Sequence, residues 1–226
     1  MLLNHIANLF FSESTIEYLV FTDIGYLTIL IMCFFLVEGY RYTHSVKKYG
    51  ERLLIFALLS EIPFRLAFGK GMGFQLGSCN VLFTLLICFC LIHVISAAMD
   101  GQTKAVLIFL LLCAGGFCDW GFLAPVFTIL FIWAEGSIER QKTVFLLDAF
   151  LLGADCFVSG AFEGAWMTGL LNAAGGMTAA LLAGVLILCC YEKEKKKDRG
   201  KWAKWFFYWF YPVHLMILTA VRAAIS

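Results

Sequence analysis

A basic stretch, VEGYRYTHSVKKYGER at residues 37–52, lies between two apolar runs and carries four cations. Its residues Glu38, Arg41 and Tyr42 are spaced i, i+3 and i+4, so on a helix they share one face. Cations at this density could bind an anionic group, such as the phosphates of a donor molecule, at a membrane surface. The alternative is a juxtamembrane basic loop that only orients the protein. The candidate donor-binding residues are Glu38, Arg41, Tyr42, Lys47, Lys48 and Arg52.

Histidines and carboxylates in or beside apolar segments form a second set of candidates. Ionisable side chains are costly inside a bilayer and usually face a cavity or a partner. A histidine with a pKa near neutrality could deprotonate an acceptor group. A histidine in a membrane helix is, equally, an ordinary structural hydrogen-bonding residue. The catalytic candidates of this set are His5, His214 and Asp119.

Three further ionisable residues have structural alternatives. Glu61 precedes Arg65 by four positions, which predicts an internal ion pair. His93 and Asp148 lie toward the inner ends of their segments, and each could be a hydrogen-bonded core group. In a transporter or a non-catalytic membrane partner, Glu61, His93 and Asp148 would instead line a proton or solute path.

The composition is that of a membrane protein. Of 226 residues, 62% are hydrophobic and 15% are charged, and the mean hydropathy is +0.85. A soluble domain carries charges at roughly a quarter of its positions. The net charge of +1 argues against nucleic acid as a partner. The sequence has no CxxC pattern and no His/Cys spacing suited to zinc, so we expect no metal site.

We predict an all-α, polytopic bundle of transmembrane helices that forms a single domain over residues 1–226. A spanning helix needs about 20 apolar residues. Residues 1–11 are too few, and we expect them to be the outer part of a truncated first helix. About eight full spanning segments should follow, near Tyr18–Gly39, Arg52–Phe68, Asn80–Met99, Thr103–Cys118, Gly121–Glu135, Thr143–Phe157, Trp166–Tyr191 and Trp202–Val221.

The distribution of Lys and Arg predicts the orientation. If the 41–52 stretch is cytoplasmic, the inner loops collect 14 of the 17 cations and the outer side has 3. The basic loops, including YEKEKKKDRGKWAK at 191–204, are then cytoplasmic. The outer side holds His5, Asp23, Asn80 and Asp119, with His214 near mid-depth. This polarity suits a reaction in which an anionic donor binds from the cytoplasm.

Two other stretches have structural interpretations. Gly176, Ala180 and Gly184 are spaced i, i+4 and i+8, which lets helices approach closely in lipid. We therefore expect this stripe to pack against another helix. The stretch FGKGMGFQLG at 68–77 lacks the Ser or Thr and the preceding strand of a phosphate-binding loop, so we expect an outer connector.

The chain resembles the TraX family of membrane proteins in stretches that follow the family's order: NHIANLFF, FFLVEGYRYTHSVKKYGERLLIFALLSEIPF, NVLFTLL, DWGFLAPVFTILFIW and FYWFYPVHL. The resemblance implies membership of a broader group of membrane acyltransferases that use an acyl-coenzyme A donor. The named plasmid members are implied to acetylate the N-terminus of pilin. The family pattern has Asp-His near the end of the first helix, where this chain has Asn4 and His5.

With the resemblance, we expect a cell-membrane acyltransferase that takes acetyl from cytoplasmic acetyl-CoA, its co-substrate. The acceptor would be an amine or hydroxyl at or beyond the outer face, on a peptide N-terminus, a glycan or a small molecule. His5 would be the general base and His214 a second catalytic or positioning group, with Asp119 nearby. Arg41 and Arg52, with the weaker Lys47 and Lys48, would pair with the donor's phosphates. The two Tyr of GYRY could stack on an adenine or anchor the helix at the interface.

Overall fold

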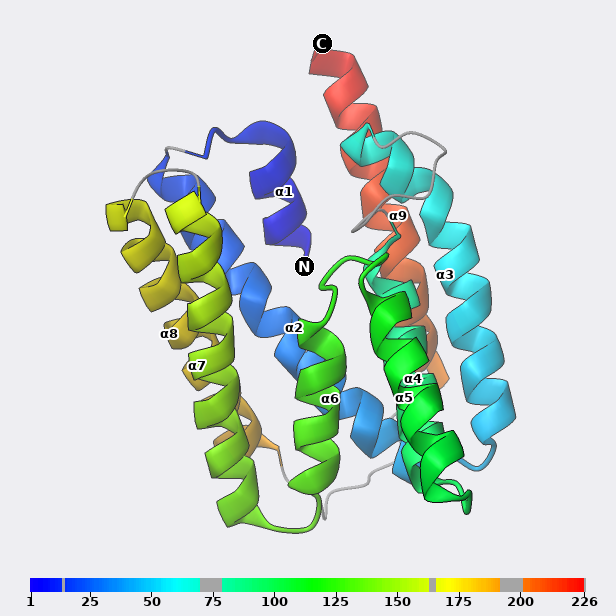
Figure 1. Cartoon of the computed structure of the whole chain (residues 1–226). Coiled ribbons are helices and arrows are strands. Elements are labelled where there is room, and N and C mark those ends of the chain that lie inside the picture. Colours follow the sequence, from blue (N-terminus) through cyan, green and yellow to red (C-terminus); the bar gives the residue numbers. More distant parts are fainter. Residues whose placement is uncertain (14, 70–78, 163–165, 192–200, 226) are drawn as a thin grey trace. The chain divides into compact units, whose positions relative to one another are not determined.

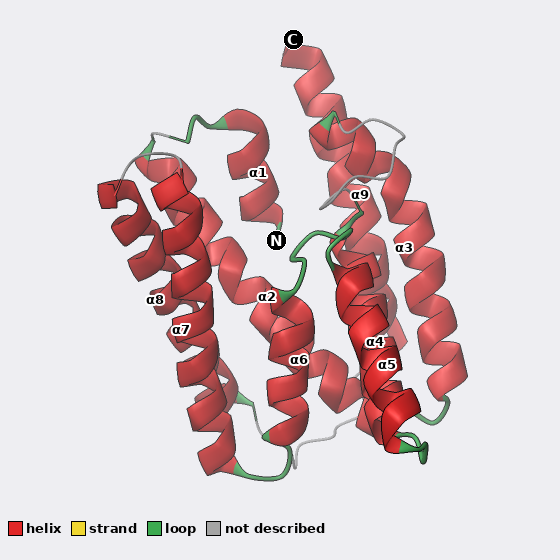
Figure 2. Cartoon of the chain, viewed as in Figure 1, coloured by secondary structure: helices red, strands yellow, loops and turns green. Residues whose placement is uncertain are grey.

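The computed structural model describes residues 1–13, 15–69, 79–162, 166–191 and 201–225, with the side chains of 201–204 left out. Within these ranges the regular secondary structure consists of nine helices (Figure 1), and no strand is present (Figure 2). They are α1 (Leu2–Phe10), α2 (Ile16–Tyr42), α3 (Val46–Phe68), α4 (Val81–Ser96), α5 (Gly101–Gly115), α6 (Leu123–Trp133), α7 (Ile138–Phe162), α8 (Trp166–Cys190) and α9 (Lys201–Ile225). The all-α prediction is confirmed.

Four of the described helices are long and apolar enough to cross a membrane: α2, α7, α8 and the Trp205–Ile225 part of α9. Helices α4, α5 and α6 have only 16, 15 and 11 residues. At the rise of an α-helix even α4 is about 24 Å long, shorter than the roughly 30 Å hydrocarbon core. The protein is therefore a helical membrane protein, but the prediction of about eight full spans is not confirmed.

The chain divides into two compact units. The first consists of Met1–Met32 and Leu130–Glu194, and the second of Cys33–Ile129 and Lys195–Ser226. The division falls inside α2 and inside α6, so each of these helices contributes to both units. The single domain expected from the sequence stays a prediction.

In the first unit, α7 and α8 form a closely packed helical hairpin. A Cβ atom added to Gly160 would lie 2.6 Å from the Cα of Gly169, so the two backbones meet without side chains between them. A Cβ atom at Gly184 would lie 2.8 Å from the Cγ of Phe145. The predicted packing role of the small-residue stripe is confirmed, because all three of its members are buried: Gly176, Ala180 and Gly184.

In the second unit, α3 pairs with α4 in an antiparallel arrangement. Near the start of α3, a Cβ atom at Gly50 would lie 2.9 Å from the ring of Phe89, in the second half of α4. Near the end of α3, Glu61 contacts Asn80, which precedes α4. The two helices therefore run in opposite directions along their shared face.

Helix α9 runs parallel to α3. The Phe56 ring stacks on Tyr208 with 5.0 Å between ring centroids. About three to four turns farther along both helices, the Nη1 of Arg222 donates a hydrogen bond of 2.7 Å to the carbonyl of Ala67. From the first contact to the second, the residue numbers increase on both α3 and α9. The two helices therefore run in the same direction, and their starts lie at the same end of this unit.

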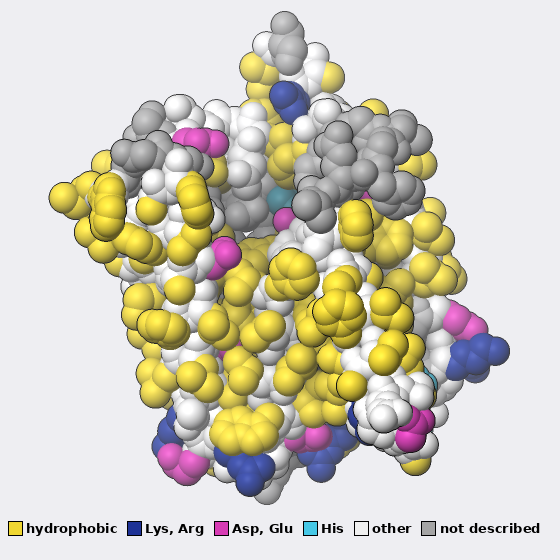
Figure 3. All heavy atoms as spheres, viewed as in Figure 1, with side chains coloured by type: hydrophobic (Ala, Val, Ile, Leu, Met, Phe, Trp, Pro, Cys, Tyr) yellow, Lys and Arg dark blue, Asp and Glu magenta, His cyan; other side chains and the backbone are white. Residues whose placement is uncertain are grey.

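Large apolar side chains cover the outward faces of individual helices. Phe109 on α5 is 65% exposed and Phe150 on α7 is 66% exposed, and Figure 3 shows these faces covered by hydrophobic atoms. Helix α3 carries a similar stripe, although it also contains charged residues: Leu54, Ile55, Leu58, Leu59, Ile62 and Leu66. Exposed apolar area on this scale is unfavourable in water and suits contact with lipid.

The basic stretch at 37–52 is mostly helical, so it is not a loop, and the alternative that it only orients the protein stays a prediction. Helix α2 continues to Tyr42, and α3 begins at Val46 with Ser45 as its N-cap. The Ser45 hydroxyl accepts a hydrogen bond of 3.3 Å from the backbone N–H of Lys48, which satisfies a donor of the first turn. Only residues 43–45 connect the two helices, and Lys47, Lys48 and Arg52 belong to α3.

Two predicted connectors fall largely outside the described residues. The outer connector at 68–77 is described only to Gly69, and the cytoplasmic basic run only at Tyr191 and from Lys201 onward. Their expected positions stay predictions.

Candidate functional site

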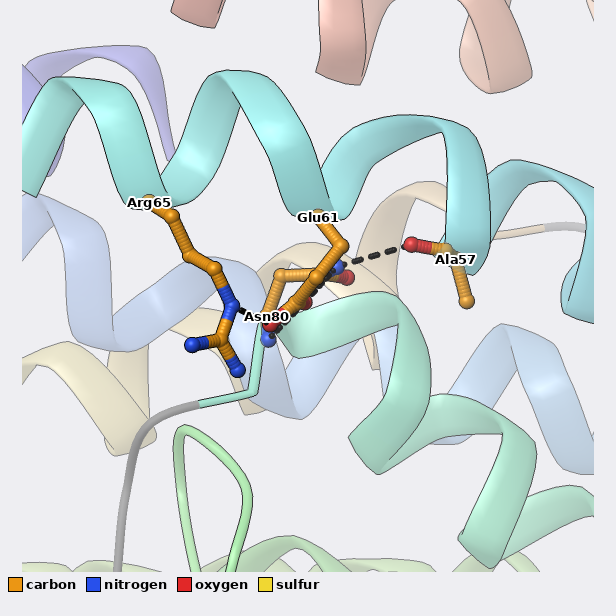
Figure 4. Close-up of polar contacts among 4 residues, drawn as sticks. All are labelled: Ala57, Glu61, Arg65 and Asn80. Atoms are coloured by element: carbon orange, nitrogen blue, oxygen red, sulfur yellow. Dashed lines mark hydrogen bonds and ion pairs between the residues drawn. The ribbon is translucent and has the colours of Figure 1, made fainter. Parts of the chain in front are cut away.

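A carboxylate between α3 and α4 organises one end of the second unit (Figure 4). The Nε of Arg65 donates to Glu61 Oε1 at 2.7 Å. The other oxygen, Oε2, accepts from the backbone N–H of Asn80 at 3.1 Å and from its Nδ2 at 2.6 Å. Asn80 Nδ2 also donates to the Ala57 carbonyl at 2.9 Å. The cluster of Glu61, Arg65 and Asn80 therefore ties the end of α3 to the start of α4.

Both carboxylate oxygens of Glu61 have partners, so the predicted i, i+4 ion pair with Arg65 is confirmed. A partly buried charge is stabilised when it is paired and hydrogen-bonded, and this one is both. The sequence analysis missed the part played by Asn80. Its Oδ1 caps α4 by accepting from the Leu82 N–H at 2.9 Å. An Asn directly before an apolar run is a helix-start pattern that could have indicated this role.

Asp119 lies beside this cluster, in the connection between α5 and α6. Its backbone N–H donates to the Cys79 carbonyl at 2.8 Å, and its own carbonyl accepts from the Thr84 hydroxyl. The fully buried Tyr211 of α9 is within electrostatic range of the carboxylates of Asp119 and Glu61. The second unit therefore brings Asp119 toward α9 at the same end as Glu61.

His214 lies on α9, next to Tyr211. Its ring is buried, stacks on Phe210 at 4.9 Å between centroids and meets Tyr211 edge-on at 5.4 Å. Nδ1 lies 2.6 Å from the Phe210 carbonyl oxygen. Because a carbonyl can only accept, Nδ1 carries the hydrogen, and Nε2 is the basic nitrogen of the neutral ring. Tyr211 is thus the shared neighbour of two predicted catalytic residues, His214 and Asp119.

His5 belongs to the first unit, on the short helix α1. Its side chain is buried. The helix is tied to α2 by the N-terminal ammonium of Met1, which donates to the Thr28 hydroxyl at 2.8 Å. Asn4, which stands where the family pattern has Asp, packs against Gly25 of α2 and accepts from Asn8 Nδ2 at 3.1 Å. The catalytic role of His5 stays a prediction.

Among the predicted donor-binding cations, Arg52 is half-buried and has aromatic neighbours on α3 and α9. Its guanidinium carbon lies 5.6 Å from the centroid of the Tyr49 ring. The guanidinium also lies in electrostatic range of the hydroxyl of Tyr208 on α9. The buried Nε–H has no hydrogen-bond partner among the residues that the structure describes. A fixed guanidinium with an unused donor is suited to an oxyanion.

The other predicted donor-binding residues differ from Arg52. The Lys47 side chain is 87% exposed and lies 4.0 Å from Glu51, and Lys48 is also exposed. On α2, Arg41 and Tyr42 are exposed, with the guanidinium 5.5 Å from the ring. Glu38 on the same helix is buried, so the three residues at i, i+3 and i+4 are helical as predicted but not equally accessible.

Tyr40, the first Tyr of GYRY, contacts α4. Its hydroxyl lies 2.8 Å from Nδ1 of His93, and its ring meets Phe89 edge-on at 5.3 Å. His93 is exposed, so its predicted place in the core is wrong, although it does have a hydrogen-bond partner. The pairing joins positions 53 residues apart, which no local pattern predicts.

The comparison with known families decides the identity. Residues 1–222 match the family described as "TraX protein". This chain belongs to the TraX family. The resemblance read from the five stretches is therefore confirmed.

A relative of this TraX-family chain is named "Probable fimbrial assembly protein FimC, serogroup H1", from Dichelobacter nodosus. The two are 32% identical over 231 residues, which cover 98% of this chain and 91% of the relative. No solved structure matches the chain.

One ionisable residue of this TraX protein has a different environment from all those above. Asp148 on α7, in the first unit, is fully buried. Neither of its carboxyl oxygens has a hydrogen-bond partner among the described residues, so the prediction of a hydrogen-bonded core group is wrong on that point. An unpartnered carboxyl in such a place is costly and is held in a membrane protein mainly where it has a function.

Proposed function

We propose that this TraX-family protein is a membrane acetyltransferase that moves acetyl from cytoplasmic acetyl-CoA to an acceptor at or beyond the outer membrane face. The observation that carries the proposal is the family match over residues 1–222. The helical, apolar character of the chain supports a reaction within the membrane.

The acceptor class that we favour is the N-terminal amine of a pilin-like subunit. Support comes from the relative named as a probable fimbrial assembly protein, which is similar to this chain over nearly its whole length. Such an amine is an acceptable nucleophile once it has lost its proton, because its ordinary pKa is near 8. Glycans and small molecules are the other acceptors to be compared.

Arg52 is the donor-binding residue that the geometry favours. It combines a guanidinium against Tyr49 with a free Nε–H donor, whereas the Lys47 ammonium is solvated and close to Glu51. An ordered, partly buried cation binds phosphate more strongly than a mobile, exposed one. We therefore assign the diphosphate of acetyl-CoA to Arg52 first, and to Arg41, Lys47 and Lys48 as weaker contributors.

The parallel arrangement of α3 and α9 supports a single basic end of the second unit. Arg52 lies near the start of α3, and its contact with Tyr208 lies near the start of α9. The positive-inside distribution favours the cytoplasm for this end. Glu61 and His214 lie farther along the same two helices, toward the opposite end, and Asp119 of the α5–α6 connection lies beside the Glu61 cluster.

The transfer itself forms one bond and breaks one. The acceptor nitrogen attacks the thioester carbonyl carbon, a histidine base takes the proton from nitrogen, and the carbon–sulfur bond breaks to release coenzyme A thiolate. The thiolate then takes up a proton from solvent. We assign the base to His5, with His214 as the second catalytic or positioning group and Asp119 as an electrostatic neighbour through Tyr211.

The test is binding and transfer with purified full-length protein in detergent. Isothermal titration with acetyl-CoA should show saturable binding, and labelled acetyl should move to a peptide that carries the N-terminus of a pilin. A matched peptide with a blocked N-terminus is the control. If the protein binds acetyl-CoA but transfers acetyl to no acceptor class, it is a coenzyme A-binding protein and not a transferase. If it does not bind acetyl-CoA at all, the proposal is wrong.

A second candidate is a proton or solute path in a non-catalytic membrane partner, and Asp148 is the observation that favours it. In that function Asp148→Asn would abolish proton-coupled uptake into proteoliposomes, while leaving acetyl-CoA binding unchanged. Glu61 supports this candidate poorly, because both of its oxygens are already bonded to Arg65 and Asn80.

A further inference from the structure

Two cysteines face each other at the end of the second unit that contains Glu61 and Asp119. Cys79 precedes α4, and Cys118 lies in the connection between α5 and α6. The backbone N–H of Cys79 donates to the Phe117 carbonyl at 3.1 Å, and the N–H of Asp119 donates to the Cys79 carbonyl at 2.8 Å. These bonds make a parallel β-bridge between Cys79 and Cys118.

The bridge pairs the backbones of the two cysteines directly. Residues paired across neighbouring extended segments are about 4.7–4.9 Å apart in the hydrogen-bonding direction. A disulfide requires a Cα–Cα separation of roughly 4.4–6.8 Å, so the pairing meets this condition. Both residues are buried, and Cys79 is among the groups in electrostatic range of the Cys118 thiol. The backbone spacing of the bridge is therefore compatible with a disulfide between them.

We propose that Cys79 and Cys118 form a structural disulfide that joins the start of α4 to the α5–α6 connection. In this step each thiol loses a proton and an electron, and one sulfur–sulfur bond forms. The oxidant is a protein dithiol oxidase of the compartment outside the membrane, whose own disulfide is reduced to two thiols. The distribution of Lys and Arg favours the outer face for this end, where disulfides persist.

The position of the crosslink gives it a role in the site. Each cysteine is followed directly by a site residue, Asn80 after Cys79 and Asp119 after Cys118. A covalent bond between the cysteines would fix Asn80, and with it the bonds to Glu61, relative to Asp119. Burial also shields both sulfurs from dissolved reagents, so the bond should form before the unit packs and then resist reduction. This inference does not depend on the proposed acetyltransferase function.

Peptide mapping of the full-length protein tests the disulfide. Cells are quenched in acid, and the protein is denatured with N-ethylmaleimide and cleaved with trypsin without reductant. Cleavage after Lys70, Lys104 and Arg140 places Cys79 in fragment 71–104 and Cys118 in fragment 105–140. We expect the two fragments as a linked pair that reductant separates. Full alkylation of both cysteines in the unreduced, denatured protein would overturn the proposal.

Three variants assign the bond, because fragment 71–104 also contains Cys88 and Cys90, and fragment 105–140 contains Cys113. Cys79→Ser and Cys118→Ser should each abolish the linked pair and leave the remaining partner open to alkylation. Cys113→Ser, at an exposed position, is the matched control and should retain the pair. Loss of the pair in Cys113→Ser, with retention in Cys118→Ser, would contradict the assignment. If a variant fails to fold, fragmentation of the linked wild-type peptides in the mass spectrometer identifies the two joined cysteines, and a link at any pair other than Cys79 and Cys118 overturns the proposal.

Discussion

One carboxylate oxygen of Glu61 receives two hydrogen bonds from a single residue, Asn80, whose backbone N–H lies 3.1 Å away and whose Nδ2 lies 2.6 Å away. Asn80 simultaneously caps α4 through Oδ1. The same side chain therefore satisfies a buried charge and begins a helix, which makes this residue a structural requirement of the second unit.

The first prediction concerns Asn80. Asn80→Ala should lower the free energy of unfolding by about 1–3 kcal/mol, because it leaves the Glu61 oxygen and the first turn of α4 short of partners. Asn80→Asp keeps the cap but sets a second carboxylate against Glu61, and should destabilise the protein at neutral pH as well. Thermal unfolding in detergent measures both. Asn8→Ala, at an exposed position, is the control and should leave the melting temperature nearly unchanged.

The second prediction concerns the donor. Arg52→Gln should weaken acetyl-CoA binding by about 1.5–3 kcal/mol, the range for a lost charge-assisted hydrogen bond. Arg52→Lys should recover part of the affinity, since it restores the charge but not the planar fork. Lys47→Gln should have a smaller effect, because Lys47 is exposed and near Glu51. Calorimetry measures the acetyl-CoA affinity of all three variants. If Arg52→Gln and the wild type bind acetyl-CoA equally well, Arg52 does not bind the donor.

The third prediction separates the two histidines. His5→Gln should reduce acetyl transfer by roughly 10²-fold or more, the usual contribution of a general base, with donor affinity nearly intact. Asn4→Asp should raise the transfer rate if a carboxylate beside His5 orients its ring. Rates and donor affinities are measured on the same preparations. If His5→Gln keeps full turnover and His214→Gln loses it, the general base is Nε2 of His214 and not His5.

The fourth prediction tests the α7–α8 contact. Gly160→Leu should prevent close packing, because the new side chain would begin 2.6 Å from the Gly169 backbone. Overpacking usually costs about 1–3 kcal/mol, and a backbone atom can move less than a side chain. The melting temperature in detergent should fall clearly. Gly101→Leu is the matched control, because a Cβ atom there has nothing within 4 Å, and it should melt close to the wild type.

The fifth prediction concerns orientation. A reporter fused after Lys197 should be cytoplasmic, and one fused at Gly73 should be external, because the inner loops hold 14 of the 17 cations. If an impermeant reagent labels a cysteine introduced at position 197 in intact cells, the predicted orientation is wrong. The unmodified chain serves as the labelling control.

Periodicity and composition predicted the helices and the pairing of Glu61 with Arg65, because those signals are local. Contacts between distant segments were not predictable. The pairing of Tyr40 with His93 depends on how α2 packs against α4, and the contact of Cys79 with Cys118 depends on the α5–α6 connection. The sequence analysis also started α3 too late, because apolar content was used to define its start while the helix begins at its Ser45 cap.

The pairing of α3 with α9 has a consequence for how the protein is made. Arg222 and Ala67 are 155 positions apart, so their hydrogen bond can form only after the ribosome has synthesised α9. Until then, the side of α3 that carries Phe56 lacks its partner helix and stays in contact with lipid or with an insertion factor. Long-range contacts of this kind slow folding and expose intermediates. A nascent chain that stalls before α9 would therefore leave the second unit incomplete, in a form that membrane proteases can recognise.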